Sequence, residues 1–369
     1  MSLVLNGTTG ITNLPSINSG QLGGRRNIVY NGEMKVAQRS TSVTGLGATS
    51  GYFTLDRWFM FLQATAGRLT MAQVADGPAG FANCMKLTTT TADTSIAAGE
   101  RLQLLQVFEG QDLQQLKKGT SGAEAVTVSF YVKANAAALY VCELLDSDGS
   151  RMNTQSFAVT TDWNRIELTF VGDTASAIVD DNTASLYLSI WLHGGATFTG
   201  GTFASNTWAA STEANRYAVA NRTSIFDATS RTFFITGVQM ELGSTATEFE
   251  SRSFGEELAL CQRYCFVMAP STNASVAPAF ARSTTVAFGI AELPVTMRAT
   301  PSLAFSANND FQVQFLGSVA TSTAMAASPE LHKNMIAFTA TVSSGLTAGQ
   351  GMYIRDLNGG ATITAAAEL

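Results

Sequence analysis

Charged residues are scarce in this chain. Lys, Arg, Asp and Glu together make up 14% of its 369 residues, against roughly 25% in an average globular protein. The formal net charge is −6 and the isoelectric point is about 5.1. Nucleic-acid binders need a basic field, so no nucleic-acid partner is expected. The basic pairs at 25–26 and 117–118 are too short to form a patch and are interpreted as solvated loop charges.

Histidine and cysteine, which supply most transition-metal ligands, are also few. The two histidines, His193 and His332, lie far apart in the sequence, and neither has a recognisable nucleophile setting around it. The four cysteines lack metal-site spacing and are expected to be buried free thiols, which suits assembly in a reducing cytoplasm. Nucleotide-loop, zinc-protease and hydrolase motifs are absent from the sequence. We therefore predict no metal, no cofactor and no catalytic residue.

Long apolar runs are missing as well. No stretch of 18 apolar residues exists, so no membrane insertion is expected. The first five residues lack a basic region and are followed by Asn6-Gly7, which does not fit a signal peptide. A surface-type composition without an export signal would be explained by a virion component that is made in a host bacterial cytoplasm and released by lysis.

The chain does contain a succession of short segments in which apolar and polar residues alternate. Apolar and polar residues alternate over 126–133 and again over 165–170, with the period of two that half-buried strands show. About ten such segments, separated by turn residues, lie between 27 and 252, one of them expected over 28–37. This pattern predicts an all-β fold with an antiparallel sandwich, and the strand count favours a jelly roll.

Two further regions flank the predicted sandwich. Residues 1–26 contain turn residues throughout, with isolated apolar residues at Ile11, Leu14 and Ile17. This segment is either a disordered leader or an extended N-terminal arm that orders against another chain and attaches the protein to a virion. Residues 253–369 predict a second β-rich C-terminal domain with a short leading helix, because acids at 256–257 precede a helical apolar spacing.

A long loop interrupts the strand rhythm between 194 and 230. Loops of this length in a compact domain are commonly functional or disordered. Aromatic rings next to amide and guanidinium donors suit sugar binding, so Trp208, Tyr217, Asn206 and Arg216 are the candidate ligand-binding residues. Two alternatives remain open: these aromatics fill a satellite core beneath the loop, or they form a subunit interface.

Several separated segments resemble bacteriophage tail-fibre and virion-surface fibre proteins. They include NIVYNGEMKVAQRSTS with YFTLDRWF near the start, VTVSFYVKA and TDWNRIELTF in the middle, and ITGVQMELGSTATEFE with GEELALCQRY at the junction. A later segment, LPVTMRATP, resembles a connector of the same proteins. The resemblance implies a jelly roll similar to carbohydrate-binding modules, a non-enzymatic structural role and a homotrimer.

The combined interpretation is a receptor-binding tail fibre that contacts host surface glycan and joins other virion proteins through its arm. A head- or neck-attached decoration protein making mainly protein contacts is the alternative. A glycan hydrolase is a remote third possibility, since paired acids occur at 146/148 and 180/181. The first pair, in Asp146-Ser147-Asp148-Gly149, is interpreted as a hairpin turn, because the later ligands of a calcium loop are missing.

Overall fold

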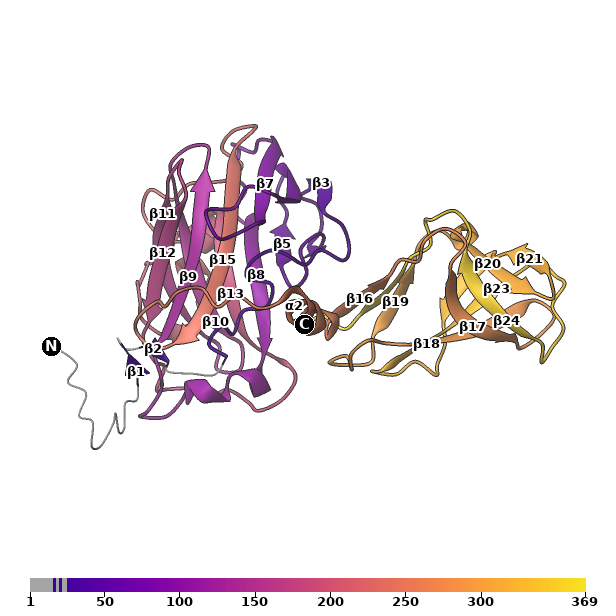
Figure 1. Cartoon of the computed structure of the whole chain (residues 1–369). Coiled ribbons are helices and arrows are strands. Elements are labelled where there is room, and N and C mark those ends of the chain that lie inside the picture. Colours follow the sequence, from indigo (N-terminus) through magenta and orange to yellow (C-terminus); the bar gives the residue numbers. More distant parts are fainter. Residues whose placement is uncertain (1–15, 18–19, 22–24) are drawn as a thin grey trace, which may run out of the picture. The chain divides into compact units, whose positions relative to one another are not determined.

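The computed structural model describes residues 16–17, 20–21 and 25–369 (Figure 1). The chain divides into two compact units, one comprising residues 1–35 with 41–252 and the other 36–40 with 253–369. All paired strands are antiparallel, and the longest helix of the described residues is α2 (Phe254–Gln262). The protein is therefore all-β, with an antiparallel jelly-roll sandwich followed by a second β-rich unit, as predicted.

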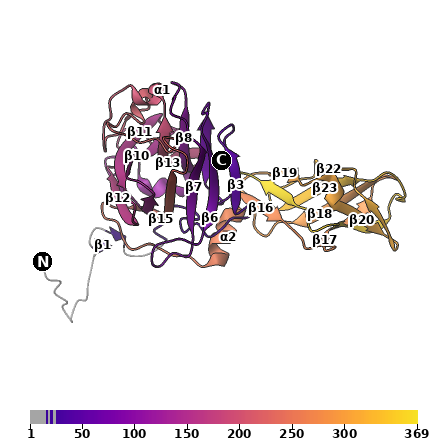
Figure 2. The same ribbon diagram turned by 90° about the horizontal axis from the view of Figure 1, so that it is seen from above.

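Two sheets form the sandwich, and Figure 2 shows them as separate layers. The six-stranded sheet has the order β12 (Asn164–Phe170), β9 (Val126–Ala134), β15 (Thr232–Leu242), β7 (Cys84–Thr91), β6 (Arg68–Val74) and β3 (Ser42–Leu46). The seven-stranded sheet has the order β14 (Ala209–Ala210), β11 (Arg151–Val159), β10 (Ala138–Asp146), β13 (Ala184–Gly194), β8 (Arg101–Glu109), β5 (Phe59–Gln63) and β4 (Gly51–Tyr52).

Aromatic rings from both sheets meet in the core between the layers. Tyr140 of β10 lies edge-on to Phe233 of β15, with ring centroids 5.5 Å apart. Phe130 of β9 and Phe157 of β11 form a second pair at 5.1 Å. All four rings are buried. Each pair joins one sheet to the other, so the core fixes how the two layers face each other.

The segment before β3 departs from the prediction. A strand was expected over 28–37, but this segment is irregular. Asn31 and Met34 have positive φ angles of 54° and 57°, and the Asn31 side chain accepts a hydrogen bond from the Lys35 amide at 2.9 Å. A Cβ on Gly32 would collide with the Val238 carbonyl oxygen. The prediction was wrong because alternating residue types cannot reveal this local turn, whose side-chain bond competes with strand pairing.

Arg252 anchors that irregular segment from the far end of the sandwich sequence. Its guanidinium is buried and donates to the carbonyl oxygens of Asn27 and Val29, the latter at 3.0 Å. Glu250 completes the clamp by accepting from the amides of Arg26 and Asn27 at 2.7 and 2.6 Å. Residues more than two hundred positions apart are thereby tied together at the place where both ends of the sandwich sequence meet.

The second unit contains two sheets and a helix. Its three-stranded sheet has the order β16 (Cys265–Met268), β25 (Ile363–Ala366) and β19 (Ser302–Phe305). Its seven-stranded sheet has the order β21 (Ser318–Thr321), β20 (Phe311–Phe315), β24 (Gly351–Asp356), β17 (Ser275–Ala281), β18 (Val286–Glu292), β23 (Met335–Thr341) and β22 (Ala324–Ala327). Helix α2 begins after Ser253, whose hydroxyl accepts from the Glu256 amide.

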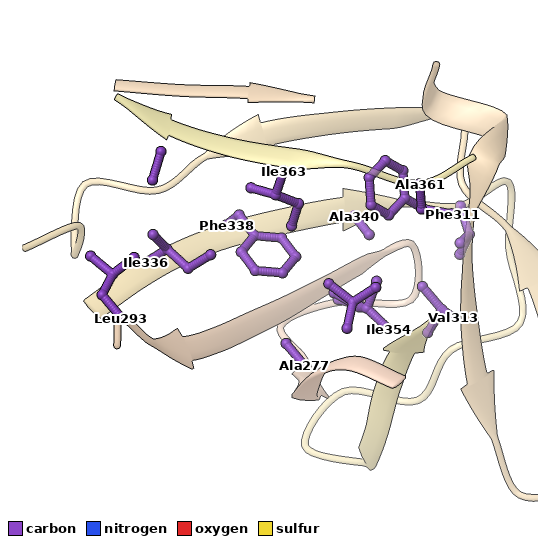
Figure 3. Packing of buried hydrophobic residues seen from close by; sticks show 14 of the residues in the cluster. Ala277, Leu293, Phe311, Val313, Ile336, Phe338, Ala340, Ile354, Ala361 and Ile363 are labelled. Atoms are coloured by element: carbon purple, nitrogen blue, oxygen red, sulfur yellow. The ribbon is translucent and has the colours of Figure 1, made fainter. Parts of the chain in front are cut away.

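Alanines and larger apolar side chains together fill the core of this second unit. Figure 3 shows Phe338 and Ile363 among the buried side chains, together with Ile336 and Ile354. The segment 36–40 belongs to this unit: Gln38 donates to the Cys265 carbonyl oxygen at 2.7 Å, and Arg39 pairs with Glu368 at 2.9 Å. A piece of chain that precedes the sandwich strands in sequence thus completes the C-terminal unit.

Three expectations concern the remaining parts of the chain. All four cysteines are buried free thiols, as expected. Of the predicted arm residues, Ile11 and Leu14 lie outside the described residues, and Ile17 belongs to β1 (Ser16–Ile17), which pairs with β2 (Gly20–Gln21). Among residues 16–17, 20–21 and 25–369, no helix is long and apolar enough to cross a membrane.

The hydrogen bonds from Arg252 to the carbonyl oxygens of Asn27 and Val29 yield a stability prediction. Arg252→Met keeps the side-chain length but removes both donors, so the free energy of unfolding of the sandwich should fall by about 2–3 kcal/mol. All four tryptophans of the chain lie in the sandwich, so denaturation followed by tryptophan fluorescence reports on this unit. Lys117→Met, which removes an exposed ion pair with Glu124, should cost about 1 kcal/mol or less. Equal losses of unfolding free energy in Arg252→Met and Lys117→Met would contradict a stabilising role for the Arg252 hydrogen bonds.

Candidate functional site at one end of the sandwich

The long loop covers the outer face of the seven-stranded sheet. Glu143 on β10 lies opposite Ser189 on β13, so Glu143 and Trp191 point to the same face, away from the core between the layers. Both side chains are nevertheless fully buried. The part of the long loop that spans residues 195–224 supplies the cover, and Figure 2 shows its helix α1 (Ala196–Thr199) on the outer side of this sheet.

Arg216 and Tyr217 hold that cover in place. Arg216 donates two hydrogen bonds to the Glu143 carboxylate, at 2.8 and 2.7 Å, and the Trp191 indole donates a third at 2.9 Å. Burial disfavours a charged Arg216, but the Glu143 carboxylate outweighs burial and raises the arginine's pKa. Tyr217 stacks on Trp191 at 5.8 Å and donates to the Thr223 carbonyl oxygen at 2.6 Å. Both predicted ligand residues therefore take part in packing, one of the alternatives left open above.

Asn206 and Trp208 bind a single residue at the end of β12. The Asn206 side chain accepts from the Val171 amide at 3.0 Å, and the Trp208 indole donates to the Val171 carbonyl oxygen at 2.7 Å. Trp208 is half-buried. Asn206 has a φ of 53°, a left-handed conformation that asparagine tolerates better than most residues. Asn206 and Trp208 contact Val171, whereas Arg216 and Tyr217 contact Glu143 and Trp191. The four predicted residues therefore do not form one site.

A buried charge cluster lies beneath Trp208. The Lys118 ammonium pairs with Asp146 and with Asp173 (2.7 Å), and it lies 4.9 Å from the centre of the Trp208 ring. Burial opposes ionisation of Asp173, but hydrogen bonds from Arg151 and Lys118 outweigh it and lower the pKa of Asp173. The interpretation of Lys118 as a solvated charge was wrong, because two buried carboxylates from distant segments require it.

The turn after β10 follows the prediction. Asp146 accepts from the Gly149 amide at 3.0 Å within the β10–β11 hairpin. The other Asp146 oxygen faces Lys118. The hairpin interpretation of residues 146–149 is therefore confirmed, and the lysine ammonium supplies the positive charge at this carboxylate.

A pocket of about 310 Å³ opens beside the covered face, and we call it the end pocket. It combines apolar surface with polar groups from the last residues of the loop. Its lining consists of Ile96, Gly194, Tyr217, Asn221, Arg222, Thr223 and Ser224. Asn221 and Arg222 are exposed, whereas Tyr217 is buried and forms part of the inner wall. Sequence reasoning missed this pocket; the only local signal was the polar run 221–224 after the aromatic part of the loop.

Behind Ser224, polar side chains form a continuous row into the interior. The Ser224 hydroxyl lies 2.8 Å from His193 Nδ1, and His193 Nε2 lies 3.2 Å from a Glu100 oxygen. Asp93 accepts from the amides of Ala66 and Gly67 at 2.9 and 3.2 Å. The row links the pocket wall to the loop between β7 and β8.

Burial sets the protonation of this row. It lowers the pKa of His193 to about 4, against a weaker opposing effect of Asp93, so the imidazole is neutral near pH 7. Burial, together with the neighbouring Asp93, also raises the pKa of Glu100. For Asp93, burial opposes ionisation, but hydrogen bonds from Glu100 and from the backbone outweigh it and lower the pKa. Of the two carboxyl groups, Glu100 therefore holds a proton more readily than Asp93.

Comparisons with known proteins find similar folds and no family. No family model matches the chain, and no curated protein matches it. One similar structure is described as "CBM4 structure and function", at 16% identity and a TM-score of 0.30, covering 57% of this chain and 97% of that chain. Another is TmCBM61 in complex with β-1,4-galactotriose, at 9% identity and a TM-score of 0.30, covering 59% of this chain and 99% of that chain.

A viral structure is also among the similar folds. The enzymatically active domain of tailspike protein 4 from bacteriophage CBA120 matches at 12% identity and a TM-score of 0.30, covering 58% of this chain and 21% of that chain. The match therefore spans about a fifth of that domain structure. Likenesses this weak leave the function to be argued from the chain's own residues.

The Arg216–Glu143 pair yields a second prediction. Glu143→Gln preserves shape but leaves the buried Arg216 without a counter-charge, so the sandwich should lose about 3–5 kcal/mol of unfolding free energy. Glu213→Gln is the matched control in the same loop, because Glu213 is exposed and lies 4.0 Å from Arg101; it should cost about 1 kcal/mol or less. Adding Arg216→Gln to Glu143→Gln should recover part of the loss, and strict additivity of the two losses would refute the coupling.

Proposed function

We propose that this chain is a non-enzymatic fibre subunit of a bacteriophage virion and that it binds host surface glycan through the end pocket. Support for the viral setting comes from the segments between 27 and 301 that resemble fibre proteins. The observation that carries the binding role is the end pocket itself, in which exposed polar groups converge on a small apolar wall. The fibre role, the homotrimer and the virion attachment through residues 1–26 all belong to this proposal.

The end pocket suits a sugar in its chemistry. A sugar ring needs an apolar surface for its CH groups, and Ile96 (42% exposed) and Gly194 provide one. Its hydroxyls need donors and acceptors, which the Asn221 amide and the Arg222 guanidinium offer at the rim. The volume of about 310 Å³ lies at the lower end of the range for small-ligand pockets, roughly 300–1,000 Å³. A terminal sugar or a short branch is therefore the expected ligand.

The walls of the pocket are rigid enough to recognise a shape. Tyr217 is fixed by stacking on Trp191 and by its bond to Thr223. Thr223 is held in turn, since its backbone amide donates to the Leu139 carbonyl oxygen at 3.0 Å. A pre-formed pocket loses little conformational entropy when a ligand binds. At the rim, Asn221 and Arg222 are exposed to solvent and can meet the sugar.

A homotrimer would suit a pocket of this kind. A small open site with few polar groups is expected to bind one sugar weakly. Several copies presented together raise the overall affinity by effective concentration, without any new contact in the pocket. Attachment of a trimer to a virion through its N-terminal arms would present the copies side by side toward a polysaccharide surface.

The third prediction tests the pocket directly. The purified chain should bind at least one member of a panel of immobilised bacterial surface polysaccharides and release no soluble sugar. Arg222→Ala removes a polar rim group and Ile96→Ser removes apolar wall, so each should weaken binding at least about tenfold, the equivalent of roughly 1.4 kcal/mol. Surface plasmon resonance measures the affinities, and a reducing-sugar assay measures turnover.

Two controls separate the pocket from the alternatives. Val179→Ser changes an apolar side chain that is 54% exposed and does not line the pocket, so binding should be unchanged. Trp208→Ala should lower the melting temperature of the sandwich because it removes the bond to Val171, yet leave binding intact. Loss of binding in Trp208→Ala with full binding in Arg222→Ala would contradict the proposed site, and release of sugar would favour a hydrolase. Binding to no polysaccharide would favour the decoration protein.

A further inference from the structure

Three buried side chains with metal-binding atoms meet behind the end pocket. Asp93 and Glu100 come from the two ends of the β7–β8 loop, and His193 comes from the end of β13. Their ligand atoms all lie within 4.8 Å of one another, and the Asp93, Glu100 and His193 side chains belong to residues only 5%, 4% and 0% exposed. We propose that these residues form a binding site for a divalent transition-metal ion, of which Zn²⁺ is the representative.

The charges around the cluster fit a cation. Two other buried carboxylates of the sandwich have a basic side chain beside them: Glu143 has Arg216, and Asp146 has Lys118. In the part of the chain that the structure describes, neither Asp93 nor Glu100 is paired with a lysine or an arginine. Glu100 instead contacts His193 at 3.2 Å and hydrogen-bonds to Asp93. A bound divalent ion would replace the Glu100–Asp93 hydrogen bond and supply the positive charge that both carboxylates need when they are ionised.

The ligands are also oriented from behind. The Ser224 hydroxyl contacts His193 Nδ1 at 2.8 Å, which directs Nε2 toward the carboxylates. One oxygen of Asp93 accepts from the Thr65 hydroxyl at 3.2 Å and from the amides of Ala66 and Gly67. Such outer contacts fix the tautomer and rotamer of metal ligands in known sites. A Cβ on Gly67 would press into the Phe226 ring, so the backbone that holds Asp93 is itself closely packed.

The donor set indicates which ions would bind. One imidazole nitrogen with two carboxylate oxygens suits Zn²⁺ and related transition-metal ions. Ca²⁺ and Mg²⁺ prefer oxygen ligands alone, and Ca²⁺ takes six or more, so both should bind more weakly here. Three protein ligands leave a fourth tetrahedral position for water. Ser224 contacts His193 and also lines the end pocket, so the cluster lies one side chain behind that pocket.

Sequence reasoning predicted no metal because no second histidine or thiol lies near His193. The ligands are instead two carboxylates seven positions apart and a histidine 93 positions after the second of them. Short-range spacing rules cannot find such a set. The proposal also does not depend on glycan binding, since the metal would bind whether or not the end pocket recognises a sugar.

The experiment uses the full chain, freed of metal with a chelator and then titrated with ZnCl₂ alone. Calorimetry should show one equivalent bound, and the melting temperature of the sandwich, followed by tryptophan fluorescence, should rise by several degrees. The chain has two histidines, His193 and His332, so ¹⁵N-histidine NMR should show two sets of ring signals. Zn²⁺ should shift the set that persists in His332→Ala, and Ca²⁺ should shift neither at the same concentration.

Variants decide between this site and adventitious binding. Glu100→Gln keeps the shape of the side chain but replaces a carboxylate ligand with an amide, which binds metal ions more weakly, so Zn²⁺ affinity should fall at least about tenfold. His332→Ala removes the exposed histidine and should leave affinity and stoichiometry unchanged. Absence of binding at millimolar Zn²⁺ would overturn the proposal, as would binding lost in His332→Ala but kept in Glu100→Gln. If Glu100→Gln fails to fold, the ¹⁵N-histidine experiment still tests the proposal: the His193 ring signals of the full chain must shift when Zn²⁺ is added, and unshifted signals would overturn it.

Discussion

The buried Glu143 carboxylate is the constraint on which this end of the sandwich depends. It lies on the outer face of a sheet, where solvent would ordinarily satisfy it, yet it is fully buried. A carboxylate in that position requires a cation, and Arg216 of the long loop forms the ion pair with it at 2.7 Å. Meeting that requirement draws the loop across the sheet and places Tyr217 against Trp191. The position of the end pocket follows, because its residues directly continue the segment that Arg216 and Tyr217 fix.

The loop therefore has two functions along its length. Its first part packs: Trp208 and Asn206 bind the end of β12, and Arg216 and Tyr217 cover the sheet. Residues 221–224, which follow this part, line the end pocket. Such a division is physically reasonable, since recognition by a loop requires that most of the loop be held rigidly. The polar row behind Ser224 extends the same support into the interior, where the proposed metal ion would strengthen it.

Period-two alternation was enough to predict the fold class and most strands, including β9 and β12, because each has one face on the core. Strand β11 was not predicted. Its sequence, RMNTQSFAV, does not alternate regularly between apolar and polar residues, because residues on both of its faces are buried. The four candidate ligand residues were the aromatic and polar groups of the loop, but their partners lie far away in sequence. Glu143 precedes Arg216 by 73 positions, and no local pattern reveals that pairing. The end pocket was missed for the same reason, because Ile96 and Ser224 meet only in the folded chain.

Hydrogen–deuterium exchange in the presence of a bound polysaccharide tests the central claim most directly. The claim is that the rim of the end pocket is the recognition surface, and that the rest of the long loop is structural. The account predicts slower exchange at residues 221–224 and around Ile96 when polysaccharide binds, with no change at 206–210. Protection confined to 206–210, or to the second unit, would contradict it.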